Sequence, residues 1–324
     1  MTSSFQPSTP QVQGAALPMH SPSEFEACIA ALWVFPIKSC AGISVQHAVL
    51  TPTGLALDRA WMVVDADGEM VTQRELARMA LIQPELVCSG ASVTELVLHA
   101  HGMVALHLPL TTDYPTENHA IHVRVWDDQV PAFNMGDEAS AWLTEFLGSS
   151  LGPLRLVRFD PDHQRPSSAK WMQGLPSLNQ FSDGFPLLLA STASLDELNA
   201  RLQAKGEAAV DMRRFRANVV LGHSAAPHAH ELMPHDEDRI GTLTFHTQGE
   251  FAQLQPVKPC PRCPIPNIDP DSAQSHPAVN DTLQLYRQDA RVNGALTFGM
   301  NCVPVAGIGQ GLRVGQRVSA DWAF

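Results

Sequence analysis

Proline is the residue that most limits what this chain can fold into. The 324 residues include 25 prolines spread along the length, and proline interrupts a regular helix because it lacks a backbone N–H. Only 17% of the residues are charged whereas 44% are apolar, which disfavours long solvent-exposed helices. Many short strands joined by tight turns suit this pattern better. We therefore expect a mainly β fold with some helix, in the α+β class.

Charge and apolar runs exclude several classes of protein. The chain carries 33 acidic and 21 basic side chains, a formal net charge of −12, which disfavours binding to nucleic acid or anionic lipid. No apolar run approaches the ~20 residues that a spanning helix needs, so we expect no membrane span. Residues 1–25 are polar and rich in Pro and Ser, which predicts a disordered tail and no signal peptide. From this we expect a cytoplasmic location and reduced thiols for the six scattered cysteines.

Apolar periodicity and turn residues predict two modules. In the first, 26–150, we expect strands at 28–34, 95–99, 103–108 and 122–126, a hairpin over 61–73, and a helix that Asp137 caps and Gly148 ends. Residues 151–180 contain several prolines and are expected to connect the modules. In the second, 181–324, we expect strands at 185–190, 218–221, 242–246 and 312–318, and a helix from a capping box at Ser194 to Gly206.

The sequence Cys260-Pro261-Arg262-Cys263 is the first chemical candidate. Such a pair can be half of a zinc site, a redox dithiol, a soft-metal ligand or two thiols without a task. No second closely spaced Cys/His pair accompanies it, which disfavours structural zinc, and the remaining cysteines are too dispersed for an iron–sulfur cluster. Flanking prolines favour a rigid loop over the helix start that a thioredoxin-like dithiol needs. Spacing alone does not distinguish a soft-metal ligand from two thiols without a task.

Cationic side chains form the second candidate. The chain has only four lysines, and Lys38 lies in a tight loop after the first expected strand. There its ammonium, the Ser39 hydroxyl and the amides near Gly42 could hold an oxyanion such as phosphate. Each arginine taken alone is more simply an ordinary solvated side chain, so only the joint pattern points to a site. Forked donors suited to phosphate or a planar heterocycle would come from Arg59, Arg213, Arg214 and Arg216.

Short stretches in a fixed order carry a resemblance. They are FPIKSC at 35–40, LDRAW at 57–61, SDGFP at 182–186, ASLDELN at 193–199, FRAN at 215–218, CPRC at 260–263, IDP at 268–270 and FG at 298–299. From about Cys28 to Ser319 the chain resembles the MOSC family of molybdenum-cofactor proteins, in particular the members with an N-terminal β-barrel domain, such as the amidoxime-reducing components. The resemblance implies an N-terminal β-barrel followed by a MOSC β-barrel with flanking helices.

The resemblance also implies a cofactor and its contacts. Cys263 would be the protein ligand to molybdenum and Cys260 a bystander, because a soft thiolate suits a metal already held by two dithiolene sulfurs. A cofactor held from both modules should lie between them and tie them together. By the same resemblance, contacts to the pterin and its phosphate fall on Lys38, Ser39, Arg59, Asp183, Arg216, Asn218 and Arg262.

The activity implied is that of a molybdenum-dependent oxidoreductase. It would reduce N-hydroxylated substrates, such as amidoximes or hydroxylamines, with electrons from a separate ferredoxin, flavin reductase or cytochrome b5 type of protein. Asp183 and Asp269 are candidate proton donors, although Asp269 before Pro270 is better suited to start a turn. Two further hypotheses are a sulfur carrier or cofactor-transfer protein that uses Cys263, and a non-catalytic cofactor carrier. No pyridoxal phosphate or iron–sulfur cluster is expected in this chain.

Two stretches need separate interpretation. Residues 264–267 (PIPN) follow Cys263 where family members usually carry polar or threonine residues, so we expect an altered substrate mouth. The segment 223–238 contains His223, His228, His230 and His235 among acidic residues. Their spacing is irregular, which favours a solvated loop over a metal-binding tract.

Overall fold

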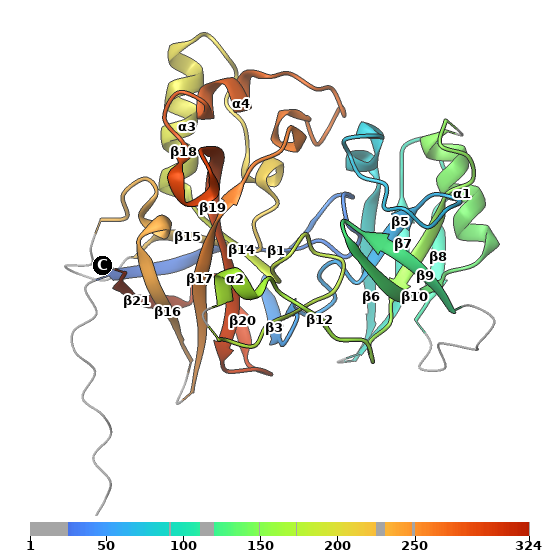
Figure 1. Ribbon diagram of the computed structural model, residues 1–324, viewed down its shortest axis with the longest axis horizontal. Coiled ribbons are helices and arrows are strands. Elements are labelled where there is room, and N and C mark those ends of the chain that lie inside the picture. The colour runs from blue at the N-terminus through green and yellow to red at the C-terminus, as the bar shows by residue number, and fades with distance from the viewer. Residues whose placement is uncertain are drawn as a thin grey trace, which may run out of the picture.

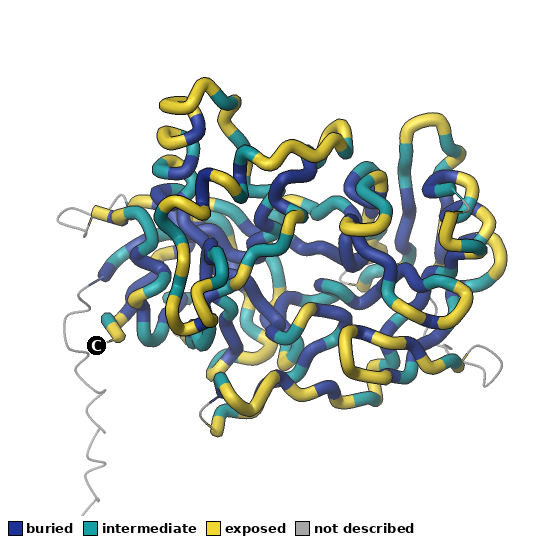
Figure 2. Tube along the Cα trace, turned by 45° about the horizontal axis from the view of Figure 1, so that its top comes forward, coloured by how far each residue is buried: buried dark blue, intermediate teal, exposed yellow. Residues whose placement is uncertain are grey.

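The computed structural model describes residues 25–90, 92–110, 120–148, 150–172, 174–224, 231–247 and 250–323. The tail predicted for residues 1–25 lies outside this range except for Phe25. Within the described residues the chain forms two lobes side by side, and strands dominate both (Figure 1). The prediction of a mainly β fold with some helix is confirmed. Buried segments run through the interior of each lobe and exposed segments lie at the periphery (Figure 2).

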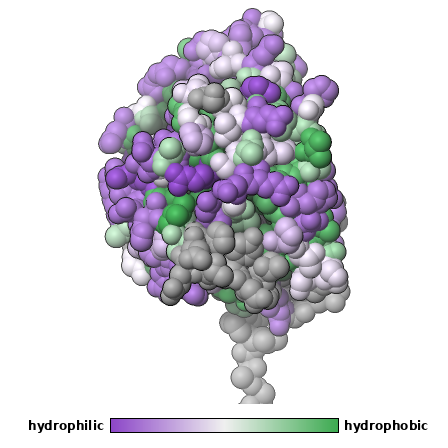
Figure 3. All heavy atoms as spheres, turned by 90° about the vertical axis from the view of Figure 1, so that its right-hand side faces the viewer, coloured by the Kyte–Doolittle hydropathy of each residue, from purple (hydrophilic) through white to green (hydrophobic). Residues whose placement is uncertain are grey.

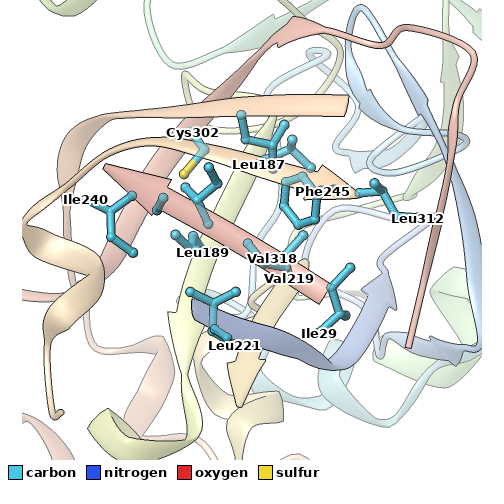
Figure 4. Close-up of a cluster of buried hydrophobic side chains, with 14 of the residues drawn as sticks. Ile29, Leu187, Leu189, Val219, Leu221, Ile240, Phe245, Cys302, Leu312 and Val318 are labelled. Atoms are coloured by element: carbon cyan, nitrogen blue, oxygen red, sulfur yellow. The ribbon is translucent and has the colours of Figure 1, made fainter. Parts of the chain in front are cut away.

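The larger lobe is a closed barrel. Because β14 pairs with both β15 and β19, the described strands close a ring of seven in the order β14-β15-β1-β21-β16-β17-β19. Side chains such as Ile29, Leu189, Val219 and Phe245 fill its interior (Figure 4) and are buried. The ring consists of β1 (Phe25–Val34), β14 (Leu187–Ser191), β15 (Val219–His223), β16 (Ile240–His246), β17 (Phe251–Pro261), β19 (Ala295–Ala306) and β21 (Arg317–Trp322).

Short elements complete the larger lobe. Strands β2 (Ile43–Val45), β3 (His47–Thr51), β4 (Gly54–Leu55), β18 (Gln288–Asp289) and β20 (Gly311–Arg313) pair at its margins. The helices are α2 (Ala169–Met172), α3 (Thr192–Ala204) and α4 (Ala278–Leu283). Leu198 and Leu202 of α3 and Leu283 of α4 are buried in one apolar cluster with Phe298, so both helices cover the outside of the barrel.

Strand β1, the first in the described part of the chain, belongs to this larger barrel. In β1, Leu32 lies opposite Val219 of β15 and Phe25 lies opposite Ala320 of β21. Figure 1 shows the same arrangement, with the blue β1 among strands from the second half of the chain. Strand pairing therefore crosses the limits expected from the sequence. The division into 26–150, 151–180 and 181–324 stays a prediction about sequence modules.

The smaller lobe contains two sheets and a helix. One sheet has the order β5-β11-β10-β9 and the other β6-β7-β8. Leu98 of β7, Leu143 of α1 and Leu156 of β11 pack in one core, although β11 lies in the stretch expected to connect the modules. On the face of the smaller lobe that Figure 3 shows, hydrophilic residues predominate in the coloured part and hydrophobic ones are scattered among them. The elements are β5 (Trp61–Val64), β6 (Gln83–Ser89), β7 (Ser92–His99), β8 (Leu106–Pro109), β9 (Ala120–Val125), β10 (Asp128–Asn134), α1 (Asp137–Leu147) and β11 (Arg155–Phe159).

Three local predictions need correction. The N-cap of α1 is Gly136 and not Asp137, which is the first residue of the helix. Helix α3 begins before the predicted capping box, because Ser191 is the N-cap and its hydroxyl accepts a 3.1 Å hydrogen bond from the Ser194 N–H. The strand expected at 312–318 is divided into β20 and β21 by a turn at Gly315.

The remaining elements are short. Strands β12 (Arg165–Pro166) and β13 (Leu178–Asn179) form a small hairpin between the lobes in sequence. The 3-10 helices are η1 (Ala77–Leu81), η3 (Met212–Phe215), η4 (Asp236–Asp238), η5 (Ile265–Asn267) and η6 (Ala290–Val292). Within the described ranges, none of the helices has the length and apolar character needed to cross a bilayer.

Candidate active site

A cleft lies where the loops after β1 and β17 and the loops before β14 and β15 meet the smaller lobe. Each residue that the family resemblance assigns to the cofactor or the metal lines this one cleft. These residues are Lys38, Ser39, Arg59, Asp183, Arg216, Asn218, Arg262 and Cys263. Their positions span more than two hundred residues of sequence, so the fold itself assembles the site.

Lys38 is held by an ion pair. Its Nζ donates to the Phe181 carbonyl at 2.9 Å and to Asp183 Oδ1 at 2.5 Å. Burial lowers the pKa of Lys38 although Asp183 opposes this effect. Desolvation would raise the pKa of Asp183, but the Lys38 charge and hydrogen bonds from Lys38 and Trp126 outweigh it and hold the pKa below its usual range. Asp183 is therefore ionised at neutral pH, which argues against its predicted role as a proton donor.

Arg59 joins the two lobes. Its Nη1 donates to Asp58 and to Asn218 Oδ1 at 3.1 Å, and its Nη2 donates to the Arg216 carbonyl at 3.1 Å. Burial raises the pKa of Asp58, and the Arg59 charge opposes this rise. The Asn218 amide is also bonded on both of its ends, because it accepts from the Leu188 N–H and donates to the Trp33 carbonyl, both at 3.1 Å. Asn218 lines the cleft mainly as a joint between chain segments.

Arg216 shares the Phe35 ring with Arg59. The guanidinium carbons of Arg59 and Arg216 lie 4.6 and 4.3 Å from the centre of that ring. Arg216 Nη1 donates to the Cys40 carbonyl, whereas its buried Nη2 has no partner among the described residues. Burial and repulsion from Arg59 lower the pKa of Arg216 to about 9. An anion in the cleft would relieve this unfavourable placement of charge.

The two cysteines of the C-x-x-C sequence differ in their partners. Both line the cleft, so Cys260 is not remote from the site. Arg262 Nη1 donates to Cys260 Sγ at 3.1 Å, and Arg262 Nη2 donates to the Phe215 carbonyl at 3.0 Å. In the described part of the chain, Cys263 Sγ has no hydrogen bond and the buried Arg262 Nε has no partner. Cys263 is thus the thiol available to an incoming ligand.

The backbone at the site is strained at three of these residues. Ser39, Arg59 and Arg216 have φ angles of 67°, 51° and 59°, a left-handed conformation that side chains other than glycine adopt at a cost. The loop after β1 also needs Gly42, because a Cβ there would lie 2.4 Å from the Phe35 ring. The local conformation that places these donors is therefore imposed by the surrounding contacts.

Several residues at the mouth of the cleft could not be recognised from the sequence. Thr72 and Arg74 from the smaller lobe line it, and Trp126 Nε1 donates to Asp183 Oδ1 at 3.1 Å. Buried Arg165 donates to the carbonyls of Gln180 and Ser182 at 2.8 and 2.7 Å and so shapes the loop that carries Asp183. No motif marks these positions. The one sequence signal was the SDGFP stretch at 182–186. It indicates that other residues must hold the loop that carries Asp183.

Three residues considered for the site lie outside the cleft. Arg213 pairs with Asp211 and Asp271, and Arg214 pairs with Asp269 at 2.8 Å. Asp269 starts a turn, as its sequence favours, since its Oδ1 accepts from the N–H groups of Asp271 and Ser272. These ion pairs leave Arg213 and Arg214 in structural roles.

The solvated loop expected for the histidine-containing segment is wrong at His235. That ring is 12% exposed, pairs with Glu197 at 3.0 Å and lies edge-on to Phe298. Burial and the Arg287 charge lower the pKa of His235 to about 4. His228 and His230 lie outside the described residues. In the part that is described, no group of three or more His, Cys, Asp or Glu side chains could hold a metal ion.

Comparison with known proteins agrees with this architecture. Residues 26–150 match the MOSC N-terminal β-barrel domain and residues 177–319 match the MOSC domain. Mitochondrial amidoxime-reducing component 1 of Homo sapiens is 35% identical over 268 residues, which cover 80% of this chain and 72% of that protein. Component 2 of Homo sapiens is 33% identical over 271 residues with the same coverage. Molybdenum cofactor sulfurase of Danio rerio is 31% identical over 83% of this chain but only 31% of that protein.

The domain order defines the class as a MOSC protein with an N-terminal MOSC β-barrel. This chain belongs to the MOSC family and shares most of its length with the amidoxime-reducing components. The names of these relatives overturn the prediction of a cytoplasmic location, because they point to mitochondria. That prediction rested on the lack of an apolar signal segment, a criterion that does not bear on mitochondrial targeting segments, which are amphipathic.

Proposed function

We propose that the cleft binds a molybdenum cofactor and that Cys263 is its protein ligand. One observation carries the proposal: a thiol without a hydrogen-bond partner shares the cleft with two buried N–H groups that also lack partners, Arg216 Nη2 and Arg262 Nε, among the described residues. An anionic, polar group with a soft metal supplies what these three groups lack. The relatives named amidoxime-reducing components and molybdenum cofactor sulfurase support the same cofactor.

The residues divide into those that bind and those that support. Arg216 and Arg262 would donate their unpartnered N–H groups to the pterin or its phosphate, and the neighbouring Ser39 hydroxyl would add a donor. Lys38 and Arg59 are already bonded to protein, so they would contribute positive charge and fix the walls of the cleft. Asn218 would act through Arg59, whose guanidinium it holds. Asp183 would orient substrate as a hydrogen-bond acceptor and would not donate a proton.

We propose reduction of N-hydroxylated compounds, of the amidoxime or hydroxylamine type, as the reaction. When bound, the molybdenum cofactor would supply two-electron oxygen-transfer chemistry. Overall, one N–O bond breaks, two electrons and two protons are consumed, and the products are the N–H compound and water. The electrons would come from a separate donor protein of the ferredoxin, flavin reductase or cytochrome b5 type. Within the site, Cys263 and the arginines hold the cofactor, and Asp183 aligns the substrate N–OH group.

The test compares three cysteine variants made in a host that synthesises the cofactor. Molybdenum per chain is measured by mass spectrometry, and benzamidoxime reduction is assayed with reduced viologen. We expect Cys263→Ala to lose at least about nine-tenths of the metal and the activity, because the protein–metal bond is gone. Cys260→Ala should retain most of the metal. The exposed Cys88, on β6 of the smaller lobe, provides the matched control Cys88→Ala, which should behave as the unmodified protein.

The outcome separates the proposals. Equal metal in Cys263→Ala and the unmodified protein would overturn the ligand assignment. Bound metal without turnover would favour a cofactor carrier. The open thiol of Cys263 and the similarity to molybdenum cofactor sulfurase also fit a sulfur-transfer protein. A sulfur-transfer role predicts a persulfide on Cys263 after exposure to a cysteine desulfurase, detected as an added sulfur atom in the intact mass.

A further inference from the structure

Trp126 occupies a strained position at the tip of the β9–β10 hairpin. Val125 pairs with Asp128, so the connecting loop has only two residues. Trp126, the first of them, has a φ angle of 57°. Glycine and asparagine favour such positions in two-residue hairpins, and a bulky aromatic side chain adopts this conformation at a cost. A strained aromatic residue in a tight turn points to a role for its side chain.

The Trp126 side chain contacts two residues that line the cleft. Its Nε1 donates to Asp183 Oδ1 at 3.1 Å, and the Arg74 guanidinium lies 4.7 Å from the ring centre. Both Asp183 and Arg74 line the cleft. Trp126 itself remains 42% exposed. The indole therefore links the two lobes at the mouth of the cleft and still presents apolar surface to solvent.

The hairpin tip is anchored on its other side as well. Asp128 pairs with Arg165 at 2.7 Å, and the Arg165 side chain is only 5% exposed. Arg165 also bonds the carbonyls of Gln180 and Ser182, in the loop that leads to Asp183. The hairpin tip and this loop thus form one bonded unit. Trp126 is consequently held in a defined place relative to the Asp183 carboxylate.

The bonding of Asp183 leaves one carboxylate oxygen available. Lys38 and Trp126 both donate to Oδ1, whereas Oδ2 makes no hydrogen bond with any residue that the structure describes. The Asp183 side chain is 70% exposed. An N–H or O–H group of a substrate could bond to Oδ2, and a flat ring attached to that group would lie against the indole.

Resting on the proposed function, we propose that Trp126 determines substrate specificity. It fixes Asp183 through one oxygen and forms, with Arg74, the wall against which a planar N-hydroxylated substrate lies. The preferred substrates are then aryl amidoximes, which combine a flat ring with N–H and O–H donors. Small aliphatic amidoximes carry the same donors without the ring, so they gain nothing from the wall.

The test compares benzamidoxime with acetamidoxime in variants of the full chain loaded with cofactor. We expect Trp126→Gly, which removes the wall and the N–H donor, to raise the KM for benzamidoxime about tenfold, the effect of losing about 1.4 kcal/mol of binding. The KM for acetamidoxime should change less than about threefold, and molybdenum content should be unchanged. Trp126→Phe keeps a ring and should give an intermediate increase for benzamidoxime. Arg124 lies on the same hairpin, in β9, and forms an exposed ion pair with Glu69. Arg124→Gln breaks this pair and serves as the control.

A second measurement does not depend on turnover. Benzamidine, the planar product, is titrated calorimetrically into each variant without an electron donor, and its Kd should rise about tenfold in Trp126→Gly. Equal KM changes for both substrates, or a benzamidine Kd within about twofold of the unmodified protein, would overturn the role of Trp126. A protein without metal or turnover that still shows the tryptophan-dependent Kd would instead refute the proposed function, and would leave only the contact between Trp126 and a planar ligand standing.

Discussion

The cations on the two sides of the cleft differ in what they are bonded to. Lys38 and Arg59, which follow β1, direct their N–H groups to protein atoms, namely Asp183, Asp58 and backbone or amide oxygens. Arg216 and Arg262 each keep one buried N–H group without a partner in the described part of the chain. These cationic residues thus divide into two sets. Lys38 and Arg59 hold the lobes together, whereas Arg216 and Arg262 keep N–H groups for a ligand.

The largest effect should come from substitution of Asp58, the buried carboxylate that pairs with Arg59. Asp58 is 1% exposed, pairs with Arg59 and accepts the Phe35 N–H at 2.8 Å. We expect Asp58→Ala to lower the free energy of unfolding by about 3–5 kcal/mol, because it leaves the Arg59 charge buried and unpaired. Urea denaturation measures this. Asp271→Ala is the control, since that carboxylate is 69% exposed and its loss should cost no more than about 1 kcal/mol. Similar losses for the two variants would break the comparison.

The next test compares Arg59, whose N–H groups bond to protein, with Arg216, which keeps one N–H group without a partner among the described residues. In protein made without cofactor, Arg59→Met should lower the free energy of unfolding by about 2 kcal/mol or more, because Asp58 loses its partner. Arg216→Met should change it by less than about 1 kcal/mol, since burial and Arg59 already lower the pKa of that guanidinium to about 9. With cofactor present, both variants should retain less molybdenum. Equal destabilisation of the two apo proteins would contradict the division.

A smaller effect should appear at low pH. The pKa of Asp183 is lower in the folded protein than its ordinary value, so its contribution to stability is present above about pH 4 and is lost as the pH falls further. The unmodified protein should therefore lose stability more steeply than Asp183→Asn below about pH 4. Because the carboxylate is 70% exposed, the difference at neutral pH should not exceed about 1 kcal/mol. Parallel pH profiles in thermal unfolding would rule out the Lys38–Asp183 contribution.

The smallest effect concerns the strained backbone. Ser39→Gly removes the cost of a φ angle of 67° and should raise the free energy of unfolding by about 0.5 kcal/mol. Ala273→Gly makes the same change at a φ angle of 57° outside the cleft and should give a similar gain. Only Ser39→Gly should also reduce molybdenum per chain. If both variants keep the metal equally, the Ser39 hydroxyl has no part in binding.

The cofactor-binding residues that the family resemblance implies all line one cleft, but their bonding could not be predicted from the sequence. Short family stretches were enough to identify Lys38, Arg59, Arg216 and Cys263, because each stretch can be recognised from adjacent residues alone. The bonding partners were not visible, since the ion pair between Lys38 and Asp183 depends on a contact between residues 145 positions apart. Trp126 carries no motif, and its position at the cleft depends on a turn from the smaller lobe.

The fold was predictable in its local elements and less so in its long-range pairing. Alternating apolar residues marked most strands, and Asp65 and Gly68 marked the turn after β5, where Gly68 has a φ angle of 82°. The membership of β1 in the larger barrel could not be foreseen, because its partner β15 lies in the second half of the chain and its partner β21 lies near the end of the sequence. His235 was misjudged for the same reason, since Phe298 covers it from a distant strand.

The pairing of β1 determines which of the two lobes can fold first during synthesis. During translation the smaller lobe, whose strands run from β5 to β11, can fold while the ribosome is still adding residues. The larger barrel can close only after β21 has been synthesised, because β1 pairs with β21. A fragment beginning at residue 181 would lack β1 and expose the edges of β15 and β21. Such exposed strand edges favour aggregation. If the cleft binds a cofactor as proposed, we expect insertion to follow the synthesis of β21, because the larger barrel closes only then.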